Sequence, residues 1–215
     1  MAQLNVLDAC DMIEAAYDQT NAADIEHQID IRGVQAQYLK SGVLVIPGTN
    51  EMADWFDFNL NISGQPTDGH GFEVVPGDSG SMWHAGFLEH AQIVYTFAKG
   101  LRPKFIIGHS LGAASAQIVG TSLRVPTLAF ASPQTLRGRP TNRLAHEGWV
   151  VNYCRLDDTV CHVPPKFLGF RTLGSRYWLA PDEINVGGDH SIDHYRALLK
   201  TKKVQDRVPM AWPPK

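Results

Sequence analysis

The most constraining feature of the sequence is the pentapeptide Gly-His-Ser-Leu-Gly at residues 108–112. An apolar run (104–107) precedes it and a run rich in small residues (113–119) follows, so we expect a strand, a sharp turn and a helix. Such a turn lifts the serine hydroxyl above the sheet and aims the next backbone N–H at a developing oxyanion. The pattern therefore predicts that Ser110 is a nucleophile and that the Leu111 N–H is an oxyanion donor.

Segments with strand and helix patterns alternate on both sides of this motif. The alternation predicts an α/β fold of three layers around a central, mostly parallel sheet. Residues 25–40 predict a β-hairpin, and residues 61–81, rich in Gly, Pro and Asp, predict a loop. No linker or repeat divides residues 1–215, so we expect one domain. The other expected strands are 43–46, 104–107, 127–131, 149–154 and 177–179, and the expected helices are 6–17, 84–99, 113–123 and 191–200.

Composition and charge narrow the class of protein. The 215 residues are 44% hydrophobic and 19% charged, which is typical of a globular chain with a large core. The formal net charge of −3, with no basic stripe, argues against a nucleic-acid partner. The odd set Cys10, Cys154 and Cys161 shows neither a disulfide framework nor zinc spacing, and this favours a reducing compartment.

No stretch of the sequence predicts secretion by a signal peptide or a membrane span. The first 17 residues lack a basic region followed by an apolar run, and no 18 consecutive residues are apolar. We therefore expect a cytoplasmic protein without stable membrane insertion, with release by a signal-less route left open.

A serine nucleophile of this type needs a carboxylate and then a histidine later in the chain. Asp157 and Asp158 directly follow the expected strand 149–154, where the carboxylate belongs. His190 follows a flexible Gly-Gly-Asp stretch just before a helix, and His194 lies four residues further on. The two histidines also have the spacing of a metal pair, but no third ligand accompanies them, so we expect no metal and no cofactor.

Several short blocks together give the chain a resemblance to the lipase class 3 family of α/β-hydrolases, typified by fungal triacylglycerol lipases. They extend from about residue 43 to 199 and cover roughly three-quarters of the chain. The blocks are Ile46-Pro47-Gly48-Thr49 with Asp54-Trp55, Trp83-His84-Ala85-Gly86-Phe87, residues 108–112, Phe130-Ala131-Ser132-Pro133, Asp158-Thr159-Val160 with Val163-Pro164, and His190-Ser191-Ile192 with Tyr195.

The resemblance implies roles for residues that the pattern alone leaves open. It implies Asp158 rather than Asp157 as the acid, His190 rather than His194 as the base, and Thr49 as a second oxyanion donor. It also implies a lid over about residues 50–62. Two departures stand out, because Pro47 replaces the family's usual Arg and Cys161 replaces its Pro.

These observations together predict a serine carboxylic-ester hydrolase, an esterase or lipase, that acts on a small-molecule or lipid ester. The expected lid is amphipathic but short and acidic, which favours short-to-medium acyl chains. Two alternatives stay open at this point. One is a non-catalytic binding module that keeps the hydrolase fold, and the other is a thioesterase, acyltransferase or amidase with the same triad.

Overall fold

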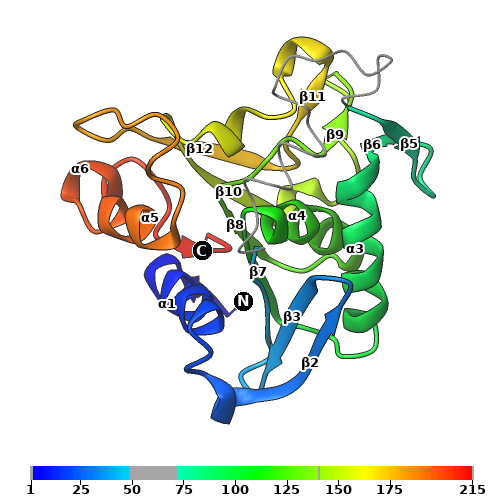
Figure 1. Ribbon diagram of the computed structural model, residues 1–215, viewed down its shortest axis with the longest axis horizontal. Coiled ribbons are helices and arrows are strands. Elements are labelled where there is room, and N and C mark those ends of the chain that lie inside the picture. Colours follow the sequence, from blue (N-terminus) through cyan, green and yellow to red (C-terminus); the bar gives the residue numbers. More distant parts are fainter. Residues whose placement is uncertain (1, 49–71, 140, 215) are drawn as a thin grey trace.

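A computed structural model describes residues 2–48, 72–139 and 141–214 (Figure 1). Within these residues, seven strands form one sheet in the order β12-β10-β8-β7-β4-β3-β2. The five strands from β12 to β4 are parallel, and β3 and β2 continue the sheet antiparallel. The strands are β2 (Ile25–Ile31), β3 (Val34–Leu39), β4 (Val43–Ile46), β7 (Phe105–His109), β8 (Thr127–Phe130), β10 (Val150–Arg155) and β12 (Ser175–Leu179).

The central strands are apolar on both faces, and successive side chains alternate between two cores. In β4, Val43 and Val45 enter one core, whereas Leu44 and Ile46 enter the other. This period of two is the geometry of a strand, and burial on both faces explains why these segments read as continuous apolar runs.

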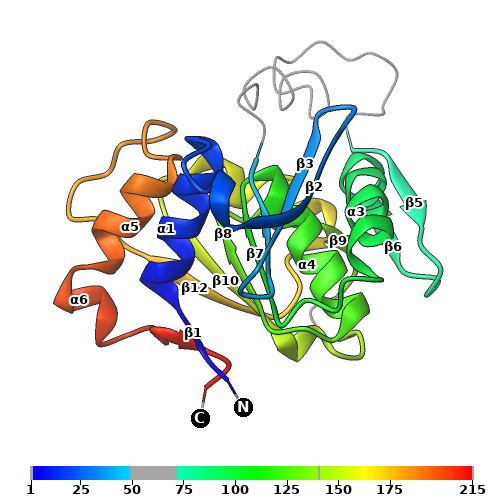
Figure 2. The same ribbon diagram turned by 90° about the horizontal axis from the view of Figure 1, so that it is seen from below.

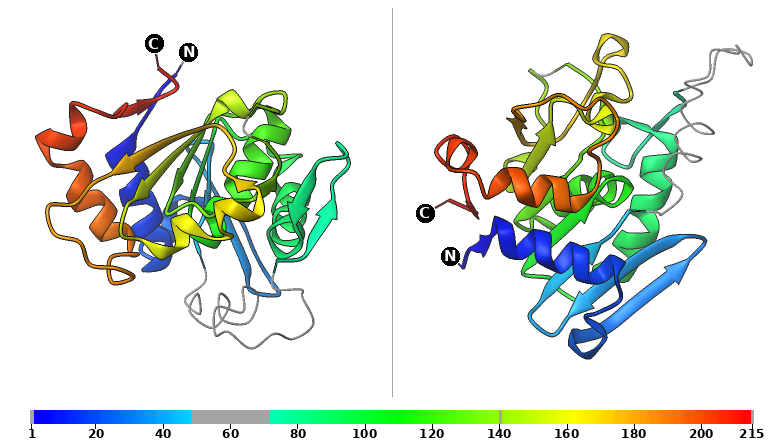
Figure 3. Two further views of the ribbon diagram at one scale, coloured as in Figure 1. Left: turned by 90° about the horizontal axis from the view of Figure 1, so that it is seen from above. Right: turned by 60° about the vertical axis from the view of Figure 1, so that its left-hand side comes forward.

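Helices cover both faces of the sheet, which confirms the expected three-layer α/β sandwich (Figure 2). Helices α1, α5 and α6 pack on one face, and α3 and α4 pack on the other. Figure 3 shows α1 and α5 side by side, although they lie at opposite ends of the chain. The helices are α1 (Val6–Tyr17), α3 (Ala85–Ala98), α4 (Leu111–Leu123), α5 (Ile192–Leu199) and α6 (Lys202–Gln205).

Two smaller sheets were not predicted. Strands β11, β9, β6 and β5 pair antiparallel in that order, and β5 lies in the segment expected to be loop. A two-stranded sheet joins the ends of the chain through β1 and β13. All six strands are two or three residues long, too short to show a period of two. They are β1 (Leu4–Asn5), β5 (Val74–Pro76), β6 (Met82–His84), β9 (Leu136–Arg137), β11 (Phe170–Arg171) and β13 (Ala211–Trp212).

None of the helices in the described residues combines the length and the apolarity that a membrane span requires.

Candidate active site

Ser110 occupies the turn between β7 and α4, at the carboxyl end of a central strand. Its φ of 61° and ψ of −124° are rare for a residue with a side chain, and strain of this kind is found at functional sites. The Ser110 N–H donates to the Phe130 carbonyl at 3.0 Å, which ties the turn to the neighbouring strand. The structure therefore confirms the strand, sharp turn and helix expected around the pentapeptide.

The two glycines of the pentapeptide are required by close backbone approach. A Cβ atom on Gly108 would lie 2.4 Å from the Gly112 carbonyl oxygen, and one on Gly112 would lie 2.0 Å from the Ile46 carbonyl oxygen. Real Cβ atoms do not approach oxygen so closely. The turn can therefore form at this position only without side chains at 108 and 112.

The structure brings Ser110, His190 and Asp158 into one line of hydrogen bonds. Ser110 Oγ lies 2.6 Å from His190 Nε2, and His190 Nδ1 lies 2.9 Å from Asp158 Oδ2. An ionised carboxylate only accepts hydrogen bonds, so the histidine proton sits on Nδ1 and leaves Nε2 free to accept from the serine. Ser110 and Asp158 are buried, while a quarter of the His190 side chain is exposed.

Asp158 stays ionised although it is buried. Burial by itself would raise the pKa of its carboxyl group, but hydrogen bonds outweigh this effect and hold the pKa below its usual range. The donors are His190 Nδ1, the Tyr195 hydroxyl at 2.6 Å and the Val160 N–H at 3.0 Å. The carboxylate can thus orient the imidazole and stabilise its charged form.

Asp157 does not contact His190. It forms a buried, bidentate ion pair with Arg155, with both N–O distances at 3.0 Å. Arg155 also binds Asp189, the residue before His190, and the Asn185 N–H donates to Asp157 at 3.1 Å. This group anchors the loop that carries His190.

His194 lies in the first turn of α5 and makes local contacts. Its Nδ1 is 3.2 Å from the Ser191 hydroxyl and 3.6 Å from Asp189. In the described ranges, no group of three or more His, Cys, Asp or Glu side chains could hold a metal ion.

Only one of the two expected oxyanion donors lies within the described residues. Leu111 is the first residue of α4, so its N–H has no partner inside the helix and lies at the positive end of the helix dipole. Thr49 and the expected lid at 50–62 lie outside the described residues.

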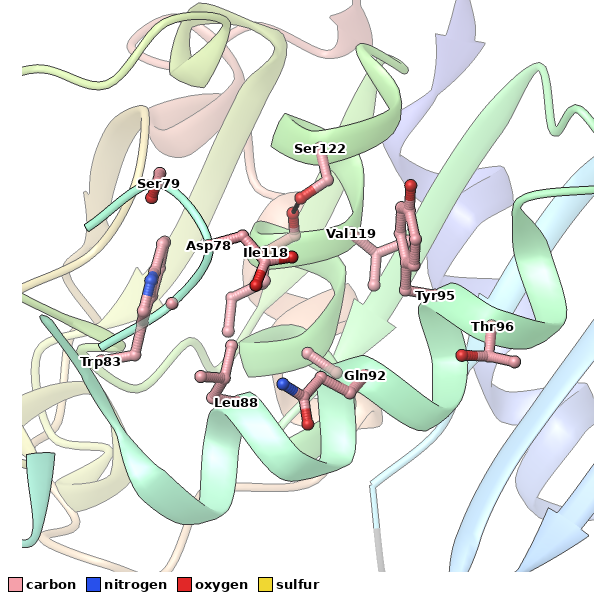
Figure 4. A pocket seen from close by; sticks show the side chains of 12 residues that line it. Asp78, Ser79, Trp83, Leu88, Gln92, Tyr95, Thr96, Ile118, Val119 and Ser122 are labelled. Atoms are coloured by element: carbon pink, nitrogen blue, oxygen red, sulfur yellow. Dashed lines mark hydrogen bonds between the residues drawn. The ribbon is translucent and has the colours of Figure 1, made fainter. Parts of the chain in front are cut away.

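A separate hollow of about 370 Å³ lies between α3, α4 and the turn at residues 77–79 (Figure 4). Leu88, Tyr95 and Ile118 are among the side chains that line it, with Trp83 and Asp78 at one side. No residue of the Ser110–His190–Asp158 line borders it. Its α4 residues begin two helical turns after Leu111, so this hollow is not where the serine meets a substrate.

Sequence reasoning missed three side chains that support the site: Tyr195, Arg155 and Tyr17. Tyr195 stood in the family block without a role, and its spacing from His190 is the only signal that could have found it. Arg155 lies 34 positions from its partner Asp189, and Tyr17 lies 92 positions from His109, with which its hydroxyl forms a hydrogen bond, so no local pattern pairs them.

Several solved structures that this chain resembles are fungal lipases. The lipase II from Rhizopus niveus matches with a TM-score of 0.60 and 18% identity, over 86% of this chain and 81% of the other. The lipase from Rhizopus microsporus var. chinensis matches with a TM-score of 0.57 and 15% identity, over 89% and 84%.

This chain has a fungal-lipase-like fold. A triacylglycerol lipase described as having a serine protease triad as its catalytic centre also matches, with a TM-score of 0.50 and 19% identity, over 73% and 66%. No protein-family model and no curated protein sequence matches the chain. The fungal-lipase-like fold is an α/β-hydrolase fold, as the sequence predicted.

Proposed function

We propose that the protein hydrolyses carboxylic esters, with Ser110 as nucleophile, His190 as general base and acid, and Asp158 as the group that orients the histidine. The observation that carries this proposal is the unbroken line from Ser110 Oγ through His190 to Asp158, at 2.6 Å and 2.9 Å. A nucleophile, a base and an orienting carboxylate in hydrogen-bond reach are the geometric signature of this chemistry.

In the first half of the reaction, His190 Nε2 takes the proton of Ser110 as Oγ bonds to the ester carbonyl carbon. The carbonyl π electrons move to the oxygen, which the Leu111 N–H stabilises, together with Thr49 as the resemblance implies. The intermediate collapses, the carbon–oxygen bond to the alcohol breaks, and the alcohol leaves with the proton from His190. The acyl group remains on Ser110.

In the second half, water takes the place of the alcohol. His190 accepts a proton from the water as its oxygen bonds to the acyl carbon, and the oxyanion forms again in the same place. The bond to Ser110 Oγ then breaks, the serine regains its proton from His190, and the carboxylic acid leaves. Asp158 keeps its charge throughout and stabilises the imidazolium in both halves.

The substrate we propose is an ester with an apolar acyl group. The structural neighbours are lipases. The sequence of the expected lid, at about residues 50–62, also contains the apolar side chains Trp55, Phe56, Phe58 and Leu60. The same segment is short and carries Glu51, Asp54 and Asp57. This composition favours short-to-medium acyl chains over emulsified fats.

The experiment is a series of p-nitrophenyl esters of increasing chain length beside an emulsified triglyceride, with Ser110→Ala as the control. The proposal expects turnover that peaks at short-to-medium chains. A peak at long chains with a jump in rate above the solubility limit would mark a true lipase. No turnover in the whole series, with no fluorophosphonate label on Ser110, would overturn the proposed function.

A further inference from the structure

His109, the residue before the nucleophile, is held at both ring nitrogens. Its Nδ1 lies 2.8 Å from the Tyr17 hydroxyl, and its Nε2 lies 3.0 Å from the main-chain carbonyl oxygen of His190. The side chain is 3% exposed, and burial lowers its pKa to about 3, so the ring is neutral. A neutral imidazole donates from one nitrogen and accepts at the other.

The direction of each hydrogen bond follows from the two ends of the chain, because the His190 carbonyl can only accept and the neutral His109 ring then accepts at Nδ1. The Gly48 N–H can only donate, and it does so to the Tyr17 hydroxyl at 2.7 Å. Burial raises the pKa of Tyr17, so the phenol keeps its proton and donates a hydrogen bond to His109 Nδ1. His109 must then carry its proton on Nε2 and donate to the His190 carbonyl. One chain of donors thus runs from Gly48 to the backbone of His190.

Packing around Gly48 supports the same connection independently. A Cβ atom on Gly48 would lie 2.8 Å from the Tyr17 hydroxyl and 2.9 Å from Ser110 Cβ. The backbone before Thr49 therefore passes in contact with both the nucleophile and the tyrosine. The Tyr17 and His109 rings meet edge to face at 5.7 Å, and the His109 and His190 rings are 5.0 Å apart.

We propose that Tyr17 and His109 are positioning residues for ester hydrolysis, which fix the Gly48 backbone and the His190 backbone relative to each other around Ser110. The inference rests on the proposed function. Neither side chain touches a reacting atom. Both act by setting the distance from His190 to the serine and the place of the chain that leads to the proposed oxyanion donor Thr49. Misplacement of about 1 Å in such a site can cost about 10²-fold in rate.

The test is Tyr17→Phe, which removes one hydroxyl and leaves the ring. With a soluble short-chain ester we expect kcat to fall by about 10- to 100-fold and KM to change less than about threefold, because geometry in the transition state is lost rather than substrate binding. The matched control is Tyr153→Phe. It also removes a buried tyrosine hydrogen bond, here to Pro209 at 2.5 Å, and we expect it to leave kcat within about twofold.

A second variant keeps the inference testable if Tyr17→Phe does not fold. His109→Asn retains an acceptor near the place of Nδ1, but its shorter side chain ends before the place of Nε2, so the hydrogen bond to the His190 carbonyl is lost. We expect a similar fall in kcat. Because the two links are in series, the double variant should lose far less than the product of the single losses.

Labelling of Ser110 by a fluorophosphonate distinguishes a failure of the proposed function from a failure of the positioning role alone. Wild-type protein that neither labels nor turns over esters overturns the proposed function, and the positioning role with it. Wild-type protein that labels and turns over, while folded Tyr17→Phe and His109→Asn match the Tyr153→Phe control in kcat, overturns the positioning role alone.

Discussion

The hydroxyl of Tyr195 lies 2.6 Å from Asp158 Oδ2, the same carboxylate oxygen that receives His190 Nδ1 at 2.9 Å. Tyr195 is fully buried on α5 and also accepts the Arg155 N–H at 3.1 Å. The tyrosine and the histidine thus both donate to Asp158 Oδ2. This contact fixes the carboxylate that orients the proposed base.

Tyr195→Phe should lower both turnover and stability. Loss of the hydroxyl removes one donor to Asp158 and leaves the Arg155 N–H buried without a partner. We expect a stability loss of about 1–3 kcal/mol, measured by urea unfolding. We also expect turnover to fall by about tenfold, since the carboxylate is less well held. Unchanged turnover in a folded variant would show that His190 alone is enough to place Asp158.

Substitutions at Asp157 and Asp158 should differ in their effects on turnover and on stability. Asp158→Asn should reduce turnover on the order of 10⁴-fold, because the imidazole loses its orienting charge. Asp157→Asn should change turnover far less but lower the free energy of unfolding, because it weakens a buried ion pair with Arg155. Turnover and urea unfolding of both variants are the measurements. A severe loss of turnover at 157 with a mild one at 158 would reverse the assignment.

The sequence predicted the central layers well because their strands and helices are marked by local sequence patterns. The five parallel strands are apolar runs, and the helices show a period near 3.6, so each is visible in a short window. Val6–Tyr17 has the predicted bounds because Asn5 caps its first turn, accepting the Leu7 N–H at 2.8 Å. The small sheet containing β5 was missed because its strands are only two or three residues long, too short to show a period of two.

The residues of the candidate site also fall into those that the sequence predicts and those that it does not. Ser110 was found from its strand, turn and helix pattern, and Asp158 and His190 were chosen through the family resemblance. The structure places the three within hydrogen-bond reach. Tyr17 and Arg155 act through contacts between distant segments, and nothing in their neighbourhoods marks them. Short motifs predict the residues of the proposed chemistry, whereas the residues that hold them in place depend on the whole fold.

Buried histidines should make the protein lose stability in mild acid. Burial lowers the pKa of His84 and His90 to about 4 and that of His109 to about 3. The unfolded chain binds protons near pH 6.5, so it gains protons first as pH falls, and stability is lost from about pH 6.5 down to the folded pKa values. We expect about 2 kcal/mol per histidine between pH 7 and pH 5, measured by urea unfolding.

His90 offers a clean control for this pH dependence. It forms a hydrogen bond with Ser115 at 2.6 Å between α3 and α4, in the core, and has no part in the proposed mechanism. His90→Asn removes one titrating group, so its loss of stability between pH 7 and pH 5 should be smaller than that of the wild type by about 2 kcal/mol. Equal pH dependence in the two proteins would show that His90 is not held neutral.

The turn between β7 and α4 should not accept a side chain at Gly112. Gly112→Ala places a methyl group 2.0 Å from the Ile46 carbonyl oxygen, and backbone must move to relieve the clash. We expect a loss of at least about 3 kcal/mol in unfolding free energy or failure to fold. Gly138→Ala, where the added carbon meets no atom within 4 Å, is the matched control and should be nearly neutral.

Whether Ser110 is the nucleophile of an ester hydrolase is decided by the turnover of a soluble short-chain p-nitrophenyl ester by wild-type protein and by Ser110→Ala. We expect the wild type to hydrolyse the ester. We expect the alanine variant, with unchanged circular dichroism, to turn over on the order of 10⁶-fold more slowly. A folded Ser110→Ala variant that kept more than about one hundredth of the wild-type turnover would contradict this expectation.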